Sequence, residues 1–188
     1  MRVHRQTRTT LDCAMLALFL FLAADRWTGN AAHEIAGVLL FLLFALHTAF
    51  NAGWYANLAR GAWPAARLVR VTANLLLLAA FAGTMAAGVL ASKTLFVFLG
   101  LAGGLEARTV HMGLAHWTLL LAGFHLGLYW PWLGTLMPQA LREGRGARLA
   151  GLAALVMAVF GAHALWVRDM DYVLTMQSAF SIWLDEDS

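Results

Sequence analysis

Five runs of apolar residues, each about as long as a membrane-crossing helix, constrain this chain more than any other feature. An α-helix needs about 20 residues to cross the hydrocarbon core of a bilayer. The runs are Thr9–Trp27, His33–Trp54, Val71–Ala91, Thr109–Trp132 and Leu149–Val167. Of the 188 residues, 12% are charged, whereas soluble domains carry about 25%. We therefore expect an all-α fold, an integral membrane bundle of about five transmembrane helices.

The first run has a second interpretation, that of a signal peptide. The arginines before it resemble a basic n-region, and Leu22-Ala23-Ala24 precedes Asp25 as a cleavage site would. We expect the run to be retained as the first span.

The distribution of basic residues predicts the orientation of the bundle. Three arginine clusters share one side of a five-span topology: Arg2, Arg5 and Arg8; Arg60, Arg67 and Arg70; Arg142, Arg145 and Arg148. Cytoplasmic loops carry the excess of basic residues, so the N-terminus is expected in the cytoplasm and the C-terminus outside. Residues 1–168 then form the five-helix transmembrane domain, and residues 169–188 form an extracytoplasmic tail. The arginines make no patch interleaved with aromatic residues, so no nucleic-acid partner is expected.

Two runs contain histidine pairs with identical spacing, His33/His47 and His111/His125. This spacing is close to four helical turns, so both imidazoles of a pair face one side of their helix, roughly 21 Å apart along its axis. The two runs are parallel because one span separates them. His33 and His111 then share the outer level, and His47 and His125 the inner level. The pattern predicts a four-helix core with two stacked haems, each iron ligated by one histidine from each helix.

A packing role or a zinc site would fit the four histidines less well than haem ligation does. One isolated histidine would be interpreted as a polar residue of a helix interface. Four that match in spacing and depth favour ligation, because ionisable residues inside membranes are costly and usually functional. A zinc site would gather its ligands at one point. Cys13 is the only cysteine, which excludes a CxxCH attachment within this chain, so the haems are expected to be b-type and noncovalent.

Two further histidines lie in the runs. His116 is about 140° round the helix from His111, so we assign it to a helix interface or a quinone pocket instead of the haem face. His163, near the outer end of the fifth run, is expected to make an interfacial hydrogen bond or to flank a quinone or proton path.

Two acidic residues are candidates for the same path. Glu34, beside His33, could carry protons, orient the imidazole or face outer water. Asp12 lies near the inner level. Quinone exchange is expected either there, around Trp54, Arg60 and Asp12, or around His163.

Cationic, small and aromatic residues could hold the haem edges and faces. Propionates are anionic and attract cations; Arg108 and Lys93 are available outside and Arg60 and Arg67 inside, with lipid headgroups as the alternative partner. Small residues near the ligands would admit a flat macrocycle or serve ordinary packing. The packing candidates are Gly37, Ala45, Gly113, Gly123, Trp54 and Trp117.

Two segments lie outside the runs. Thr94–Gly104 is apolar but too short to span, so we expect it to fold over the outer haem or to lie in the interface. The tail Asp169–Ser188 ends in an acidic group and is expected to be an interfacial helix or a docking segment for an extracytoplasmic partner. The sequence has no nucleotide-binding fingerprint, so the chain alone is not expected to perform NAD or flavin chemistry.

The motifs around the histidines resemble the DUF4405 family of flavinylation-associated cytochromes. His33–Gly37, His47 and Asn51–Tyr55 are similar to the family's HE-x-x-G, its second histidine and its N-x-x-W-Y. The second signature consists of Arg108–His111, Trp117 and His125–Trp130, and the resemblance covers roughly Leu11 to Leu133. Tyr129 stands where members commonly have a histidine, Thr48 follows His47, and the acidic tail is atypical.

The resemblance implies a b-type cytochrome of a bacterial cytoplasmic membrane, related in architecture to the cytochrome b561 and ferric-reductase bundles. The family's motif histidines correspond to the four already named. Implied partners are an extracytoplasmic FMN-carrying protein or another electron-transfer subunit.

We therefore expect electron transfer across the membrane between a quinone pool and an extracytoplasmic partner, as in a quinone reductase or quinol oxidase. Two imidazoles saturate an iron and suit it to electron transfer. A haem-bearing anchor subunit of a larger oxidoreductase is one alternative. A proton, metal or haem transporter that uses the histidines as relays is another, and a structural scaffold is a third.

Overall fold

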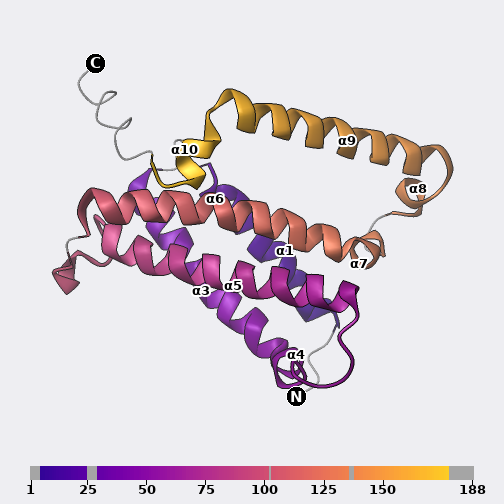
Figure 1. Ribbon diagram of the computed structural model, residues 1–188, viewed down its shortest axis with the longest axis horizontal. Coiled ribbons are helices and arrows are strands. Elements are labelled where there is room, and N and C mark those ends of the chain that lie inside the picture. Colours follow the sequence, from indigo (N-terminus) through magenta and orange to yellow (C-terminus); the bar gives the residue numbers. More distant parts are fainter. Residues whose placement is uncertain (1–4, 25–28, 102, 136–137, 178–188) are drawn as a thin grey trace. The chain divides into compact units, whose positions relative to one another are not determined.

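Each of the five apolar runs overlaps a long α-helix that begins a few residues before the run (Figure 1). The computed structural model describes residues 5–24, 29–101, 103–135 and 138–177. The regular elements in these residues are all helical: α1 (Arg5–Leu22), α3 (Asn30–Phe50), α4 (Ala52–Ala56), α5 (Ala65–Ala91), η1 (Val97–Leu99), α6 (Gly104–Leu128), α7 (Trp130–Gly134), α8 (Gln139–Arg142), α9 (Gly144–Val167) and α10 (Met170–Leu174). The expected all-α fold is confirmed.

Local chemistry explains where the helices begin and end. Helix α5 starts six residues before the apolar run does, directly after Pro64, whose φ of −65° suits the start of a helix. Helix α3 ends before its run does. The Asn51 side chain donates from Nδ2 to the His47 carbonyl at 2.8 Å, and α4 begins one residue later. Helix α9 follows Glu143 and opens on Gly144, whose φ of +59° favours glycine.

In the described part of the chain, three helices are long and apolar enough to cross a membrane: α3, α5 and α9. Most of α9 is exposed and apolar, with Phe160 71% and Met157 68% accessible. An apolar exposed surface of this kind suits a lipid-facing helix. Helix α1 carries Arg5, Arg8 and Asp12 within 18 residues, which makes it less apolar than these three. These three helices agree with the expected membrane protein, and the expected number of five spans stays a prediction.

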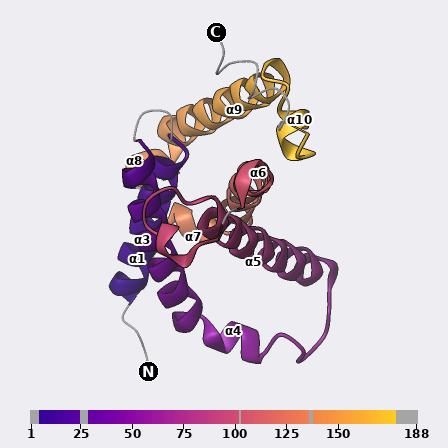
Figure 2. The same ribbon diagram turned by 90° about the vertical axis from the view of Figure 1, so that its left-hand side faces the viewer.

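The chain divides into two compact units. The first unit comprises the described residues of Met1–Ala65 and Met85–Arg108, and it includes α1, α3 and α4. Helix α1 packs along α3 (Figure 2). Near the end of α3, Nη2 of Arg8 donates to the Phe50 carbonyl at 2.8 Å.

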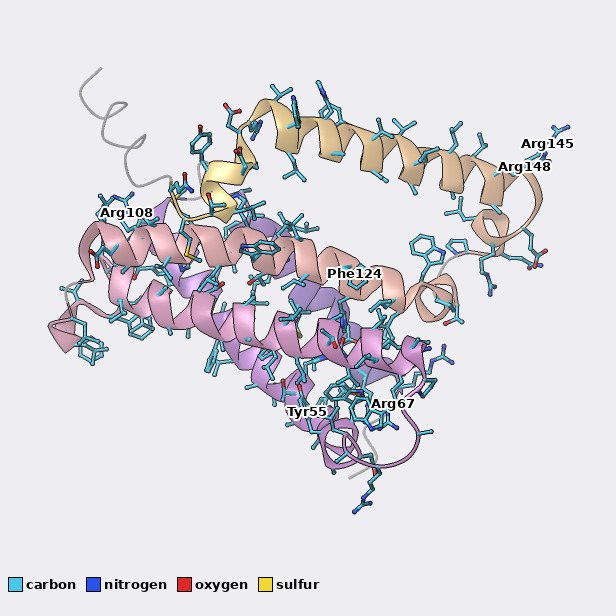
Figure 3. All side chains as sticks on the ribbon, viewed as in Figure 1. Tyr55, Arg67, Arg108, Phe124, Arg145 and Arg148 are labelled. Carbon is cyan, nitrogen blue, oxygen red and sulfur yellow. The ribbon has the colours of Figure 1, made fainter. Side chains whose placement is uncertain are left out.

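The second unit comprises Ala66–Thr84 and the described residues of Thr109–Ser188. Within it, α5 and α6 approach closely at Gly83, where an added Cβ would lie 2.7 Å from Leu114 Cδ1. One residue later, the Thr84 and Thr118 hydroxyls lie 3.1 Å apart and are both buried. These contacts place the α6 histidines beside α5. The basic residues Arg145 and Arg148 lie in the first turns of α9 (Figure 3).

Candidate functional site

The members of each histidine pair share a unit, with His33 and His47 in the first and His111 and His125 in the second. Both pairs lie on single helices, α3 and α6. The predicted placement on two long helices is therefore confirmed, and ligation stays a prediction.

His47 is bonded to a carboxylate from the neighbouring helix. Its Nδ1 lies 2.8 Å from Oδ1 of Asp12 on α1, and the two side chains are 31% and 33% exposed. An ionised carboxylate only accepts hydrogen bonds, so Nδ1 is the donor. Nε2 lies 3.4 Å from Nδ2 of Asn51, a long contact from an amide whose shorter bond is to the His47 carbonyl.

His111 is bonded to the backbone of α5. Its Nδ1 lies 2.9 Å from the Thr84 carbonyl oxygen. A carbonyl oxygen has two lone pairs and can accept this bond in addition to a helical one. Here too Nδ1 must be the donor, because the carbonyl has no proton to give.

His125 is bonded to a side-chain amide of α5. Its Nδ1 lies 2.9 Å from Oδ1 of Asn74, while Nδ2 of Asn74 donates to the Tyr129 hydroxyl at 3.3 Å. The second bond fixes which end of the amide faces the histidine. The Tyr129 ring lies beside the His125 imidazole, with centroids 4.8 Å apart. Tyr129 thus supports the Asn74 amide that bonds His125.

These three hydrogen bonds have one chemical consequence. A neutral imidazole that donates from Nδ1 keeps its lone pair on Nε2, the atom that can then bind a metal. Metal-ligating histidines almost always donate their other N–H to a carboxylate, carbonyl or water, which fixes the ring and raises its basicity. The donor set at His47, His111 and His125 therefore fits axial ligation of haem iron.

His33 lies in the first turn of α3 and is half-buried. Its neighbour Glu34 binds the segment that follows α5. The carboxylate accepts hydrogen bonds from Asn30 Nδ2 (2.7 Å), Ser92 Oγ (2.7 Å), Lys93 N (2.8 Å), Thr94 N (3.2 Å), Thr94 Oγ1 (2.6 Å) and Leu95 N (2.7 Å). Glu34 therefore ties the loop at the end of α5 to the start of α3.

That loop carries an exposed apolar turn. The segment predicted to fold over a haem or to lie in the interface forms η1, in which Phe98 is 80% exposed. Gly103 returns the chain to α5, since its N–H donates to the Leu90 carbonyl at 3.1 Å. An added Cβ at Gly103 would lie 2.8 Å from that carbonyl oxygen, so the close approach needs a glycine.

The histidines that were not chosen as ligands differ in their surroundings. His116 Nδ1 bonds to the Met112 carbonyl of its own helix at 2.8 Å, a contact that fixes the ring to no other element. His163 is exposed on α9. The quinone and proton roles predicted for both stay predictions.

The predicted packing residues lie in varied surroundings. An added Cβ at Gly37 or Gly123 would meet no atom within 4 Å. At Gly113 it would lie 2.8 Å from Met176 Cγ and 3.1 Å from the Val173 carbonyl oxygen. The chain itself therefore fills the space beside Gly113.

The described start of the C-terminal tail is held against α6. Trp117 Nε1 donates to the Leu174 carbonyl, at the end of α10, at 3.0 Å. The tail's acidic end lies outside the described residues.

The basic residues lie near helix ends. Arg67 lies near the start of α5 and Arg108 in the first turns of α6 (Figure 3). Arg60 donates from Nη1 to Asn57 Oδ1 at 3.4 Å, and Lys93 bonds Glu34 through its backbone, which leaves its ammonium available for an anion. Trp54 packs edge-on against Tyr55, with centroids 4.9 Å apart.

Two partners of the histidines were missed from the sequence. Asn74 is an amide within the third apolar run, and an uncharged polar residue in such a run is a usable signal. The Thr84 carbonyl gives no such signal, because every residue supplies a carbonyl.

Among the described residues, no group of three or more His, Cys, Asp or Glu side chains could hold a metal ion together. Comparison of the chain with protein-family models, curated proteins and solved structures gives no match.

Proposed function

We propose that this chain is a di-haem b-type cytochrome, a five-helix integral membrane protein that transfers electrons across a bacterial cytoplasmic membrane. His33 and His111 would hold the outer iron, and His47 and His125 the inner one. The resemblance to the DUF4405 family supports the same four ligands.

One observation carries the proposal. Three of the four candidate ligands donate from Nδ1 to a partner on another helix, and the three partners belong to different chemical classes. A histidine that only fills a helix interface needs a hydrogen bond from one ring nitrogen. It sets no requirement on the second ring nitrogen. Here each bond leaves Nε2 with its lone pair, as haem ligation requires.

The residues of the chain divide the work. Asp12, Thr84 and Asn74 fix the tautomer and orientation of three imidazoles. Bound haem supplies one-electron redox chemistry, and the protein supplies ligands, depth and electrostatics. Arg108 and Lys93 at one end of the bundle, and Arg60 and Arg67 at the other, would neutralise the propionates.

The electrons would pass between a quinone pool and an extracytoplasmic redox partner, such as an FMN-carrying protein. The three apolar helices α3, α5 and α9 support the membrane location. Arginines gather at the N-terminal ends of α1, α5 and α9, in their first turns or just before them. This distribution supports a cytoplasmic N-terminus and an extracytoplasmic C-terminus.

Haem stoichiometry tests the proposal. The purified chain should contain two haems by pyridine hemochrome and give a reduced-minus-oxidised spectrum with sharp bands of bis-histidine haem. His47→Ala and His125→Ala should each lose the same single haem, because both would ligate one iron. A chain without haem bands would overturn the proposal and favour a transporter that uses the histidines as relays. Tightly held additional subunits in the purified material would assign the chain as a membrane anchor of a larger oxidoreductase.

A further inference from the structure

The carboxylate of Asp12 distinguishes His47 from His111 and His125. Of the three acceptors described for Nδ1, Asp12 alone is charged; the Thr84 carbonyl and the Asn74 amide are neutral. The Asp12 bond also joins two helices, between residues 35 positions apart in the sequence. Asp12 is therefore built into the packing of α1 on α3.

A carboxylate on Nδ1 does more than orient an imidazole. It draws the Nδ1 proton towards itself and increases the electron density on Nε2, so the histidine becomes a stronger donor to a metal. A stronger anionic donor stabilises ferric iron over ferrous iron and lowers the reduction potential. Axial-ligand electronics and hydrogen bonding to the ligand are among the main means by which a protein sets that potential.

We propose that Asp12 is a positioning residue that lowers the reduction potential of the haem ligated by His47 below that of the other haem. The inference rests on the proposed function, because it needs a haem at His47. It also predicts the direction of electron flow. Electrons move from the haem of lower reduction potential to the haem of higher potential, here from the inner haem to the outer one.

Other charged groups lie near these ligands, and none of them reverses the proposed order of the two reduction potentials. Arg8 lies one turn before Asp12 on α1, and its Nη2 donates to the Phe50 carbonyl. Glu34 lies beside His33, but its two oxygens accept six hydrogen bonds, three of them from backbone N–H groups of the loop after α5. These donors offset its charge. Cations are proposed at both haems, Lys93 and Arg108 at the outer one and Arg60 and Arg67 at the inner one. They would raise both potentials, so the difference is assigned to the Asp12 bond.

The test is a spectroscopic redox titration of the haem-loaded protein in lipid nanodiscs, fitted with two one-electron couples. In Asp12→Asn the lower of the two potentials should rise by at least about 59 mV. This shift corresponds to a tenfold change in the equilibrium constant of a one-electron reduction. The higher potential should not change. Glu106→Gln, which removes an exposed carboxylate from the first turn of α6, is the matched control and should move neither couple.

The exchange of the two partners extends the test. Asn74→Asp alone should lower the potential of the haem ligated by His125. In the double variant Asp12→Asn/Asn74→Asp that couple should return towards its original value, because both histidines are proposed to ligate one iron. Opposite shifts in two different couples would support the role of Asp12 and reject the pairing of His47 with His125.

The outcomes separate the two proposals. A wild-type protein without haem overturns the proposed function. Two haems whose potentials are both unmoved by Asp12→Asn, or both moved equally, overturn the role of Asp12 and leave the cytochrome proposal standing. If the Asp12→Asn protein loses one haem, the Asn74→Asp variant provides the test. Two potentials equal to those of the wild-type protein in Asn74→Asp would then reject the inference.

Discussion

Asn74 and His125 are joined by a 2.9 Å hydrogen bond between residues 51 positions apart, so the first half of α5 fixes the imidazole near the end of α6. Asn74→Ala should release this ring. Loss of such a partner typically reduces metal affinity about 10- to 100-fold, and we expect a similar loss of haem affinity at the His125 site. Haem titration into the apoprotein, followed by absorbance, measures it. Gln139→Ala removes an exposed amide of α8 whose Nε2 donates to Glu143 Oε2 at 3.4 Å, and it should leave the titration unchanged.

The two α6 histidines nearest in sequence should behave differently. His111→Ala should remove one haem per chain, whereas His116→Ala should leave both. The physical reason is that His111 is held by α5, while the Nδ1 bond of His116 goes to a carbonyl of its own helix. Pyridine hemochrome on the two purified variants gives the answer. Equal haem loss in both would show that the face assignment of α6 is wrong.

Glu34→Gln should loosen the segment Ser92–Leu95. The amide offers one acceptor atom where the carboxylate offers two, and its NH2 group would face donors. Each lost bond to a charged group is worth about 1.5–3 kcal/mol. Hydrogen exchange of the Lys93, Thr94 and Leu95 amides should therefore quicken by roughly tenfold or more. Unchanged protection would mean that different contacts hold the loop.

Gly113→Ala should detach α10 and the residues directly after it from α6. The new methyl group would meet Met176 and the Val173 carbonyl oxygen, and overpacking of this kind costs about 1–3 kcal/mol. Trypsin cleavage after Arg168 should then be several-fold faster than in the wild-type protein. Gly161→Ala is the matched control, because an added Cβ there meets no atom within 4 Å.

Cysteine labelling tests the topology in a Cys13→Ser background. Ala62→Cys, between α4 and α5, should react with an impermeant maleimide from the cytoplasmic side only. Phe98→Cys, in η1, should react from the opposite side, because α5 lies between the two positions and is long enough to cross. Gln6→Cys should label from the same side as Ala62→Cys if α1 and α3 both cross. Labelling of Gln6→Cys and Ala62→Cys from opposite sides would reduce the number of spans.

The sequence predicted the helices well because apolar runs and helix formation have the same cause in a bilayer, where the backbone must bond internally. It predicted their ends less well. The apolar run starts at Val71, where the arginines end, but α5 starts at Ala65, where Pro64 permits it. Hydropathy follows side chains, whereas a helix start depends on backbone geometry.

The four candidate ligands could be named from the sequence, and their ligation of haem stays a prediction. The hydrogen-bond partners of their imidazoles could be named only in part. His47 and Asp12 could each be singled out from the sequence, but their contact depends on how α1 packs on α3. Glu34 is adjacent to His33 in the sequence, which suggested that its carboxylate could orient that imidazole. In the structure its oxygens instead accept hydrogen bonds from a loop about 60 residues away. Adjacency in sequence is a poor guide here, because successive residues on a helix point in different directions.

The bond from His111 to Thr84 differs from the other two because no amino-acid substitution can replace its acceptor atom. A single codon change at position 12 or 74 replaces the acceptor with another chemical group. No codon change at position 84 removes the carbonyl, because it belongs to the main chain. Across related sequences, natural variation should therefore retune the surroundings of His47 and His125 while His111 keeps one constant partner.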